Sequence, residues 1–170
     1  MRAEGVKPSE VGEWVLLSYR MPREPSTPRI AVWRKLKRLG VAQLADGLVA
    51  LPADARTREH LEWLADEVLD AGGTAGIWIA HPASVSQERD LAASMAEARA
   101  VEYRAVIAEA RGAAGLDEGA RQSAARRLRA ELRRVTRRDY FPPPERERAR
   151  LAVEALVQPS EVDLRRGSER

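Results

Sequence analysis

The chain of 170 residues contains no cysteine. Disulfides, thiolate metal ligands and cysteine nucleophiles are therefore excluded, and nothing indicates an oxidising compartment. The N-terminus lacks the apolar core of a signal peptide, and no apolar run approaches the ~20 residues that a membrane helix needs. We therefore expect a cytoplasmic protein that does not enter a membrane.

The sequence also lacks a recognisable catalytic or cofactor-binding pattern. Neither of its two histidines, His60 and His81, has a cysteine or carboxylate at metal-ligand spacing with a second histidine. Gly112, Gly115 and Gly119 do not follow a predicted strand, so they do not form a phosphate-binding loop. We expect no metal, no cofactor and no enzymatic activity. We interpret His60 as an exposed helix residue and His81 as structural, with oxyanion binding as the alternative for His81.

Lysine is scarce, because the chain has 26 arginines and only 3 lysines. A guanidinium group binds phosphates and oxyanions bidentately, although genome base composition also explains a general excess of arginine. The net charge is only +3, but it is distributed unevenly. Residues 26–40 carry five bases and no acid, residues 54–72 six acids and two bases, and residues 119–138 eight arginines and one glutamate. This clustering is the more informative signal.

Residues 26–40 predict a helix. Ser26 or Thr27 can cap its N-terminus, Pro28 fits its first turn, and Gly40 stands where a helix-ending glycine would. An apolar face is formed by Val32, Trp33, Leu36 and Leu39, and the opposite face carries Arg34, Lys35, Lys37 and Arg38.

A β-hairpin is predicted directly after this helix. Residues 41–45 and 48–51 are short apolar runs that flank Asp46-Gly47. This dipeptide is typical of a two-residue hairpin turn in which both central residues have positive φ.

The remaining elements predict a β-α-β-β-α-β order over residues 14–81. Residues 14–19 and 74–80 are the first and last strands, the first being apolar on both faces as in a central strand, and Thr57 can cap a second helix over residues 58–71. This order is typical of an α+β, ferredoxin-like domain with both helices on one face of an antiparallel sheet. We expect core or subunit-interface positions for its tryptophans, because base stacking would need exposure. They are Trp14, Trp33, Trp63 and Trp78.

A helical extension is predicted after the sheet domain. Ser84 and Gln87 have capping-box spacing and begin a long helix that ends near residues 112–115. Two more helices follow, over residues 117–139 and 145–157. The expected organisation is a flexible N-terminus (1–13), a ferredoxin-like domain (14–83), an arginine-rich helical extension (84–158) and a flexible tail (159–170).

The expected apolar stripes of the extension are narrow and rich in alanine. Such helices bury little area each, so they should pack on each other or on a second protomer, and we expect a homodimer. In the first long helix the stripe comprises Leu91, Met95, Ala98, Val101 and Ala105; in the second it comprises Ala125, Leu128, Leu132 and Val135.

The two basic clusters are candidate phosphate contacts on DNA. For the first cluster, the alternatives are a solvated helix face or pairing with the acidic second helix. For the second, the alternative is a solvated helix whose arginine stems cover apolar surface. The candidate DNA-binding residues are Arg29, Arg34, Lys35, Lys37, Arg38, Arg126, Arg129, Arg133 and Arg137.

Several segments resemble the N-terminal domain of the ChrB family of chromate-resistance regulators. The matching stretches are WVLLSYRMPREPSTPRIAVWRKLKRLG, VAQLADGLVALPADART, IWIAHPA and RRDYFPPPER, within residues 14–150. The resemblance implies DNA binding and a role in controlling a chromate-efflux operon. Family members commonly continue into a second domain, so we expect a separate chromate-sensing partner, or little direct response of this chain to chromate.

More distantly, the order of elements is similar to the small CRISPR integration subunits and to the middle domain of PaaX-type repressors. Some of those CRISPR subunits are metal-dependent nucleases with an aspartate after a tyrosine at the end of the first strand. Here Tyr19 is followed by Arg20, whose guanidinium group cannot ligate Mg²⁺. This distant resemblance therefore implies a nucleic-acid-handling scaffold without nuclease chemistry.

The leading hypothesis is a DNA-binding transcriptional regulator, or regulator subunit, of a chromate-resistance operon. The alternative is a non-enzymatic accessory protein that docks a separate sensory domain without binding DNA. An enzyme that processes oxyanions or nucleotides is disfavoured, because no set of catalytic groups is visible.

Overall fold

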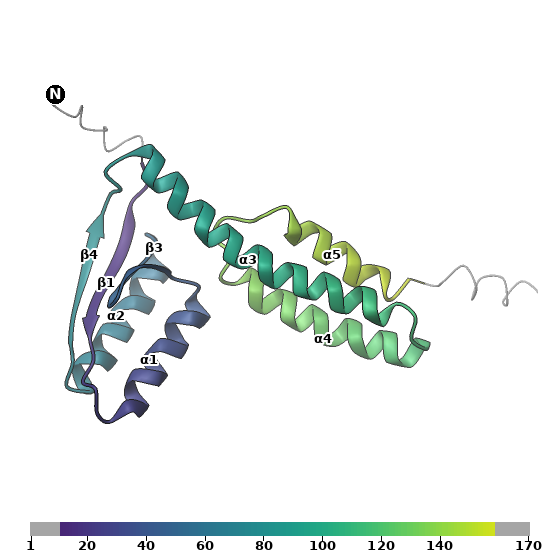
Figure 1. Ribbon diagram of the computed structural model, residues 1–170, viewed down its shortest axis with the longest axis horizontal. Coiled ribbons are helices and arrows are strands. Elements are labelled where there is room, and N and C mark those ends of the chain that lie inside the picture. The colour runs from purple at the N-terminus through teal and green to yellow at the C-terminus, as the bar shows by residue number, and fades with distance from the viewer. Residues whose placement is uncertain (1–10, 159–170) are drawn as a thin grey trace, which may run out of the picture. The chain divides into compact units, whose positions relative to one another are not determined.

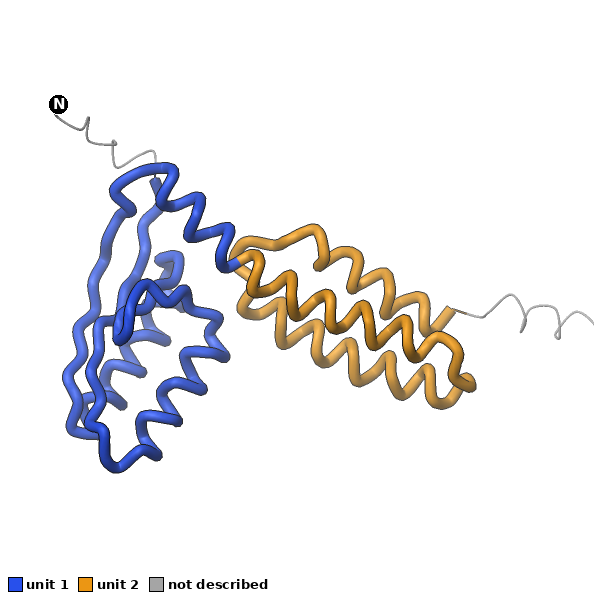
Figure 2. Tube along the Cα trace, viewed as in Figure 1, with its two compact units in different colours: residues 1–95 blue, residues 96–170 orange. Residues whose placement is uncertain are grey.

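The computed structural model describes residues 11–158 and divides the chain into two compact units, residues 1–95 and 96–170 (Figure 2). The expected flexible tail and most of the expected flexible N-terminus lie outside the described residues. Residues 11–13 are held in place: the Gly12 amide donates to Glu88 Oε1 (2.8 Å), and the Glu13 carbonyl accepts from the Ala53 amide (2.9 Å).

The first unit is built on a four-stranded sheet with the order β2-β3-β1-β4, in which every neighbouring pair is antiparallel (Figure 1). Helices α1 and α2 cover one face of it. The α+β class and the predicted β-α-β-β-α-β order are therefore confirmed. The elements are β1 (Trp14–Arg20), α1 (Ser26–Leu39), β2 (Ala42–Ala45), β3 (Leu48–Pro52), α2 (Ala55–Asp70) and β4 (Thr74–Ala80).

The core of this unit lies between the sheet and its two helices. Residues i and i+2 of a strand point to the same face, so Val15 and Leu17 of β1 share a face with their partners Leu51 and Val49 of β3. All four are buried, as are the apolar faces of the helices. The helix residues in this core are Val32 and Leu36 of α1 and Leu61, Leu64, Ala65 and Val68 of α2.

Of the four tryptophans only Trp14 lies in the core, and for the other three the predicted alternative, a subunit interface, stays a prediction. Trp14 is 3% exposed, whereas Trp33, Trp63 and Trp78 are 52%, 58% and 59% exposed. Trp33 follows Val32 directly, and one residue turns a helix by about 100°, so the ring lies beside the buried face and not on it. Exposure satisfies the geometric requirement for binding a partner through these rings, whatever the partner is.

The predicted N-terminal caps of both helices are wrong. Helix α1 follows Pro25 and has no side-chain cap. Helix α2 is capped by Asp54, whose Oδ1 accepts from the Thr57 amide (2.7 Å), while Thr57 Oγ1 accepts from the Asp54 amide (2.9 Å). Thr57 is thus the third residue of the helix, the N3 position of a reciprocal capping box, and not the cap itself. The predicted C-terminal residue of α1 is confirmed, since Gly40 has φ +70°.

The predicted hairpin forms, but its turn differs from the expected type. Gly47 has φ +72°, and no other described residue except Gly40 and Gly72 has positive φ, so Asp46 does not. The register between β2 and β3 shifts between Gln43 and Ala45. A bulge with one left-handed glycine is the other common way to close a short hairpin.

The second unit is helical. Helix α3 (Val85–Ala113) starts in the first unit, and α4 (Glu118–Thr136) and α5 (Glu145–Ala155) follow. Ser84 Oγ accepts from the Gln87 amide (3.1 Å) at the start of α3, as predicted. The units divide between Met95 and Ala96, inside α3, whereas the expected boundary was at residues 83–84. Within residues 11–158 no helix combines the length and apolarity needed to cross a bilayer.

The predicted stripe of α3 is wrong beyond Met95. Val101 is 55% exposed, and Ala98 and Ala105 are exposed too. Tyr103 and Val106, one or two positions further along the helix, take the buried face. The predicted stripe of α4 is confirmed, with Leu132 partly buried. The buried cluster comprises Tyr103, Val106, Ala110, Ala113, Ala125, Leu128, Val135, Ala149, Val153 and Leu156.

The closest backbone approach in the hairpin generates a stability prediction. A Cβ on Gly47 would lie 2.3 Å from the Tyr19 carbonyl oxygen, at a φ that L-residues disfavour. Gly47→Ala should therefore lower the free energy of unfolding of the sheet domain by more than the ~1–2 kcal/mol of the left-handed backbone alone. Gly112→Ala is the matched control, because nothing lies within 4 Å of its new methyl group and helix propensity favours alanine there. Urea unfolding followed by circular dichroism at 222 nm measures both, because each unit contains helices. Equal stability of the two variants would contradict this account.

Candidate nucleic-acid interface

Helix α4 carries an exposed stripe of arginines. Its apolar side, Ala125, Leu128 and Val135, is buried in the helical unit, so the basic side chains between these positions point outward. We call Arg126, Arg129, Arg133 and Arg137 the arginine stripe. All four are exposed, and within residues 11–158 none of them has an acidic partner. At 1.5 Å of rise per residue the stripe is about 16 Å long.

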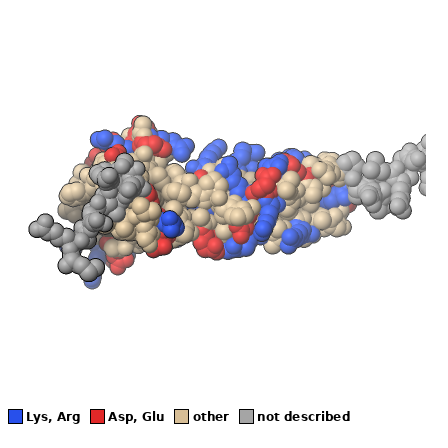
Figure 3. All heavy atoms as spheres, turned by 90° about the horizontal axis from the view of Figure 1, so that it is seen from above, with Lys and Arg blue, Asp and Glu red and all other residues tan. Residues whose placement is uncertain are grey.

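The other arginines of the helical unit differ because most of them are paired. Arg127 Nη1 lies 2.6 Å from Glu109 Oε2, and Arg134 pairs with Glu131. On α3 and α5, Arg104 pairs with Glu97 and Glu145, and Arg150 pairs with Glu147 and Glu154. Basic and acidic side chains are accordingly interspersed over the face of the helical unit that Figure 3 shows. Among the described residues the four stripe arginines therefore have no ion-pair partner, in a unit where most of the other arginines are paired.

Helix α1 presents the second predicted basic surface. Arg34, Lys37 and Arg38 are exposed, because Val32 and Leu36 hold the opposite face on the sheet, and Arg29 is exposed in the first turn of the helix. The Lys37 ammonium group lies 5.2 Å from the centre of the Trp33 ring, a cation–π distance.

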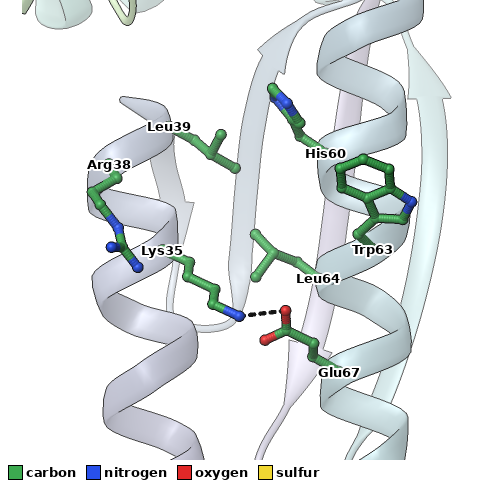
Figure 4. Close-up of a pocket in the computed structure, with 7 residues that line it drawn as sticks. All are labelled: Lys35, Arg38, Leu39, His60, Trp63, Leu64 and Glu67. Atoms are coloured by element: carbon green, nitrogen blue, oxygen red, sulfur yellow. Dashed lines mark hydrogen bonds and ion pairs between the residues drawn. The ribbon is translucent and has the colours of Figure 1, made fainter. Parts of the chain in front are cut away.

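Lys35 is the one predicted residue of α1 that is engaged elsewhere. Its Nζ lies 2.5 Å from Glu67 Oε1 on α2, and both side chains are 41% exposed (Figure 4). This contact is the pairing with the acidic second helix that the sequence left open as an alternative. A pair this exposed adds little stability, but it withdraws Lys35 from the set of free cations.

A groove of about 310 Å³ lies between α1 and α2. Arg38 and Leu39 of α1 line one side, and His60, Trp63 and Leu64 of α2 line the other, with the Lys35–Glu67 pair at one end (Figure 4). The His60 and Trp63 ring centres are 6.0 Å apart and tilted by 52°. Sequence reasoning missed this groove, because the spacing of each helix alone does not reveal which residues of two helices face each other.

The segment between α4 and α5 is fixed by a buried polar network. The Tyr103 hydroxyl donates to Asp139 Oδ2 (2.8 Å), and the Asp139 side chain is completely buried. Arg146 Nη1 lies 4.0 Å from the same carboxylate oxygen, and Arg138 pairs with Glu102 on α3. The RRDYFPPPER stretch therefore serves to hold α4 and α5 on α3, and its Arg138 is not part of the exposed stripe.

Two other positions considered in the sequence are His81 and Arg20. His81 Nδ1 lies 3.2 Å from the Gly12 carbonyl oxygen, and its Nε2 lies 3.9 Å from Glu13. Arg20 is exposed at the end of β1. Among the described residues, no group of three or more histidine, cysteine, aspartate or glutamate side chains is placed to hold a metal ion.

The fold and surfaces thus define an α+β protein whose helical unit carries a row of arginines without ion-pair partners among the described residues. A family described as "Protein ChrB, N-terminal" matches residues 29–162, and the chain belongs to this family. Protein ChrB of Cupriavidus metallidurans is 29% identical over 159 residues, which cover 87% of this chain and 48% of that protein. The chain therefore spans about half the length of this curated relative. No solved structure matches the chain.

The Tyr103–Asp139 contact generates a pH-dependent prediction. Burial, followed by the interactions with Asp139, raises the pKa of Tyr103 to about 12, above the ~10 of an unfolded chain. The neutral phenol therefore stabilises the fold below pH ~10, and this contribution is lost as the pH rises from about 10 to about 12.

Tyr103→Phe should lower the free energy of unfolding at pH 8 by ~1–3 kcal/mol, because the buried Asp139 loses its donor. The difference from the wild type should shrink when both proteins are unfolded in urea near pH 11, with circular dichroism at 222 nm as the signal. A difference that stays constant with pH would contradict the assignment.

Proposed function

We propose that this chain is a DNA-binding regulator, or regulator subunit, of a chromate-resistance operon. In this proposal the arginine stripe of α4 makes the main contacts with the phosphate backbone. The observation that carries the proposal is the stripe itself: four exposed arginines along one side of a helix, unpaired within the described residues, in a unit where most other arginines are paired. Membership of the ChrB N-terminal family supports the regulatory role.

The stripe has a cost that a polyanion would remove. Like charges at i,i+4 destabilise a helix by a few tenths of a kcal/mol per pair, and the stripe contains two such pairs, Arg129–Arg133 and Arg133–Arg137. Bound phosphates would turn this repulsion into charge-assisted hydrogen bonds. Guanidinium groups in a row on one helix also suit backbone tracking better than base readout, because phosphate contacts carry no direct sequence information.

Helix α1 is less suited to the main contact. Its basic residues lie next to α2, which carries Glu59, Glu62, Asp66, Glu67 and Asp70. The Lys35–Glu67 ion pair shows how close the two sets are. Adjacent packed helices lie within about one Debye length of each other, so these carboxylates offset the attraction of α1 for a duplex. We therefore assign α1 a smaller share of the DNA affinity.

Substitution of the stripe tests the proposal. Arg126→Ala, Arg129→Ala and Arg133→Ala combined should weaken binding to all duplexes about equally. The slope of log K against log salt concentration should flatten by up to ~2.7, because each phosphate contact contributes about 0.9. Fluorescence anisotropy with the intergenic DNA upstream of the gene, and with a scrambled duplex, measures both effects.

The matched control is the triple variant Arg127→Ala, Arg134→Ala and Arg150→Ala. It removes the same number of positive charges, three, but from residues that are ion-paired in the free protein. Its salt slope should stay closer to that of the wild type. Equal slopes for the two triple variants would show that net charge alone drives binding, and the stripe would lose its assigned role.

An accessory protein without DNA binding is the second candidate function. The observation that favours it is the α1–α2 face, where an exposed tryptophan lies in a groove between helices of opposite charge. Aromatic and arginine side chains are common anchors of protein interfaces. A wild-type chain that binds no duplex at low salt, with or without chromate, would favour this candidate over the regulator.

A further inference from the structure

The outer face of α1 and α2 carries two parallel ridges of opposite charge. Arg34 and Arg38 form the basic ridge on α1, and Glu59 and Asp66 form the acidic ridge on α2. All four side chains are exposed, and none has an ion-pair partner within the part of the chain that the structure describes. The Lys35–Glu67 ion pair lies between the ridges and carries no net charge.

Apart from this ion pair and His60, the strip between the ridges is apolar. It is the groove already described, where Leu39 and the buried Leu64 provide hydrocarbon and Trp63 contributes an indole that is 58% exposed (Figure 4). A half-exposed tryptophan in a groove with charged flanks is the usual composition of an interface centre, with the polar groups at its rim.

We propose that this face binds a second copy of the chain, with the basic ridge of each copy on the acidic ridge of the other. The face is complementary to itself in charge. A closed two-fold pair uses such a surface twice, because every contact from one copy to the other is repeated in reverse.

The charge pattern also selects the orientation of the two-fold axis. An axis parallel to the helices places α1 of one copy over α2 of the other, so that Arg34 and Arg38 meet Asp66 and Glu59. An axis lying across the helices would place α1 on α1 and α2 on α2, with like charges opposed on both sides. The favourable axis runs along the groove, and it places the Trp63 ring of each copy, which lies over α2, over α1 of the other copy (Figure 4).

The dimensions of the face predict a weak dimer. At 1.5 Å per residue, the 14 residues of α1 and the 16 residues of α2 extend about 21 and 24 Å. Two helices of this length give an interface at the small end of the range for specific complexes. We expect dissociation in the micromolar range and, because the rims are charged, weaker association at high salt.

This inference does not depend on DNA binding, since the association is measured without DNA. The experiment is sedimentation velocity of the full chain from about 1 to 100 μM, at low and high salt, with circular dichroism to establish folding. Variant one is Arg34→Glu and Arg38→Glu, and variant two is Glu59→Arg and Asp66→Arg. In a dimer of either variant alone, like charges face each other at both ridges. The dissociation constant of each variant should therefore be at least about tenfold higher than that of the wild type.

The equimolar mixture of the two variants is the decisive sample. In a mixed dimer, the glutamates at positions 34 and 38 of variant one meet the arginines introduced on α2 of variant two. The native Glu59 and Asp66 of variant one meet the native Arg34 and Arg38 of variant two. Both ridges are then complementary, so the mixture should recover the dimer that each variant alone has lost.

Three results would overturn the proposal. They are a wild-type chain that stays monomeric over the whole concentration range, a wild-type dimer that both variants retain, and a mixture of folded variants that fails to recover the dimer. Trp63→Ala tests the same face independently. Its dimer should also be weaker than that of the wild type, because the substitution removes a large apolar side chain and leaves the charges unchanged. An unchanged dimer in this variant would likewise contradict the assigned axis.

Discussion

The surfaces of the sheet domain depend on how α1 and α2 are buried against the sheet. Val32 and Leu36 of α1, with Leu61 and Val68 of α2, insert between helix and sheet at no more than 3% exposure. Each such side chain contributes about 1.5–3 kcal/mol of hydrophobic burial. Their positions fix the rotation of both helices, and that rotation alone decides that Arg34 and Arg38 face outward, that Trp33 and Trp63 are exposed, and that Lys35 reaches Glu67.

The same constraint sorts the arginines of the helical unit. Burial of Ala125, Leu128 and Val135 sets the rotation of α4, which brings Arg127 to Glu109 on α3 and leaves Arg126, Arg129 and Arg133 without ion pairs in the part of the chain that the structure describes. The buried Tyr103–Asp139 contact then fixes the segment that leads to α5. Two kinds of arginine therefore coexist in one run of sequence, one holding the bundle and the other free for a partner. A composition count cannot separate them.

The order and type of the elements could be predicted because they rest on local signals. Gly40 ends α1 with a left-handed φ, and the apolar positions of α2 and α4 repeat at the helical period. Errors arose where two local signals compete. Ser26, Thr27 and Thr57 can all cap a helix, but Pro25 and Asp54 precede them and mark the actual starts. On α3, alanines surround the helix, so the choice between the Val101 and Tyr103 faces depends on what packs against it.

Residue type and spacing along one chain are enough to predict the α+β class, the family, the two basic clusters and the four positions of the arginine stripe. The pairing of Lys35 with Glu67, the exposure of three tryptophans, the groove at Trp63 and the division of arginines into paired and unpaired were decided only by the tertiary structure. Each of these depends on the distance between side chains on different elements, and that distance is set by helix rotation and sheet register, not by the sequence of either element alone.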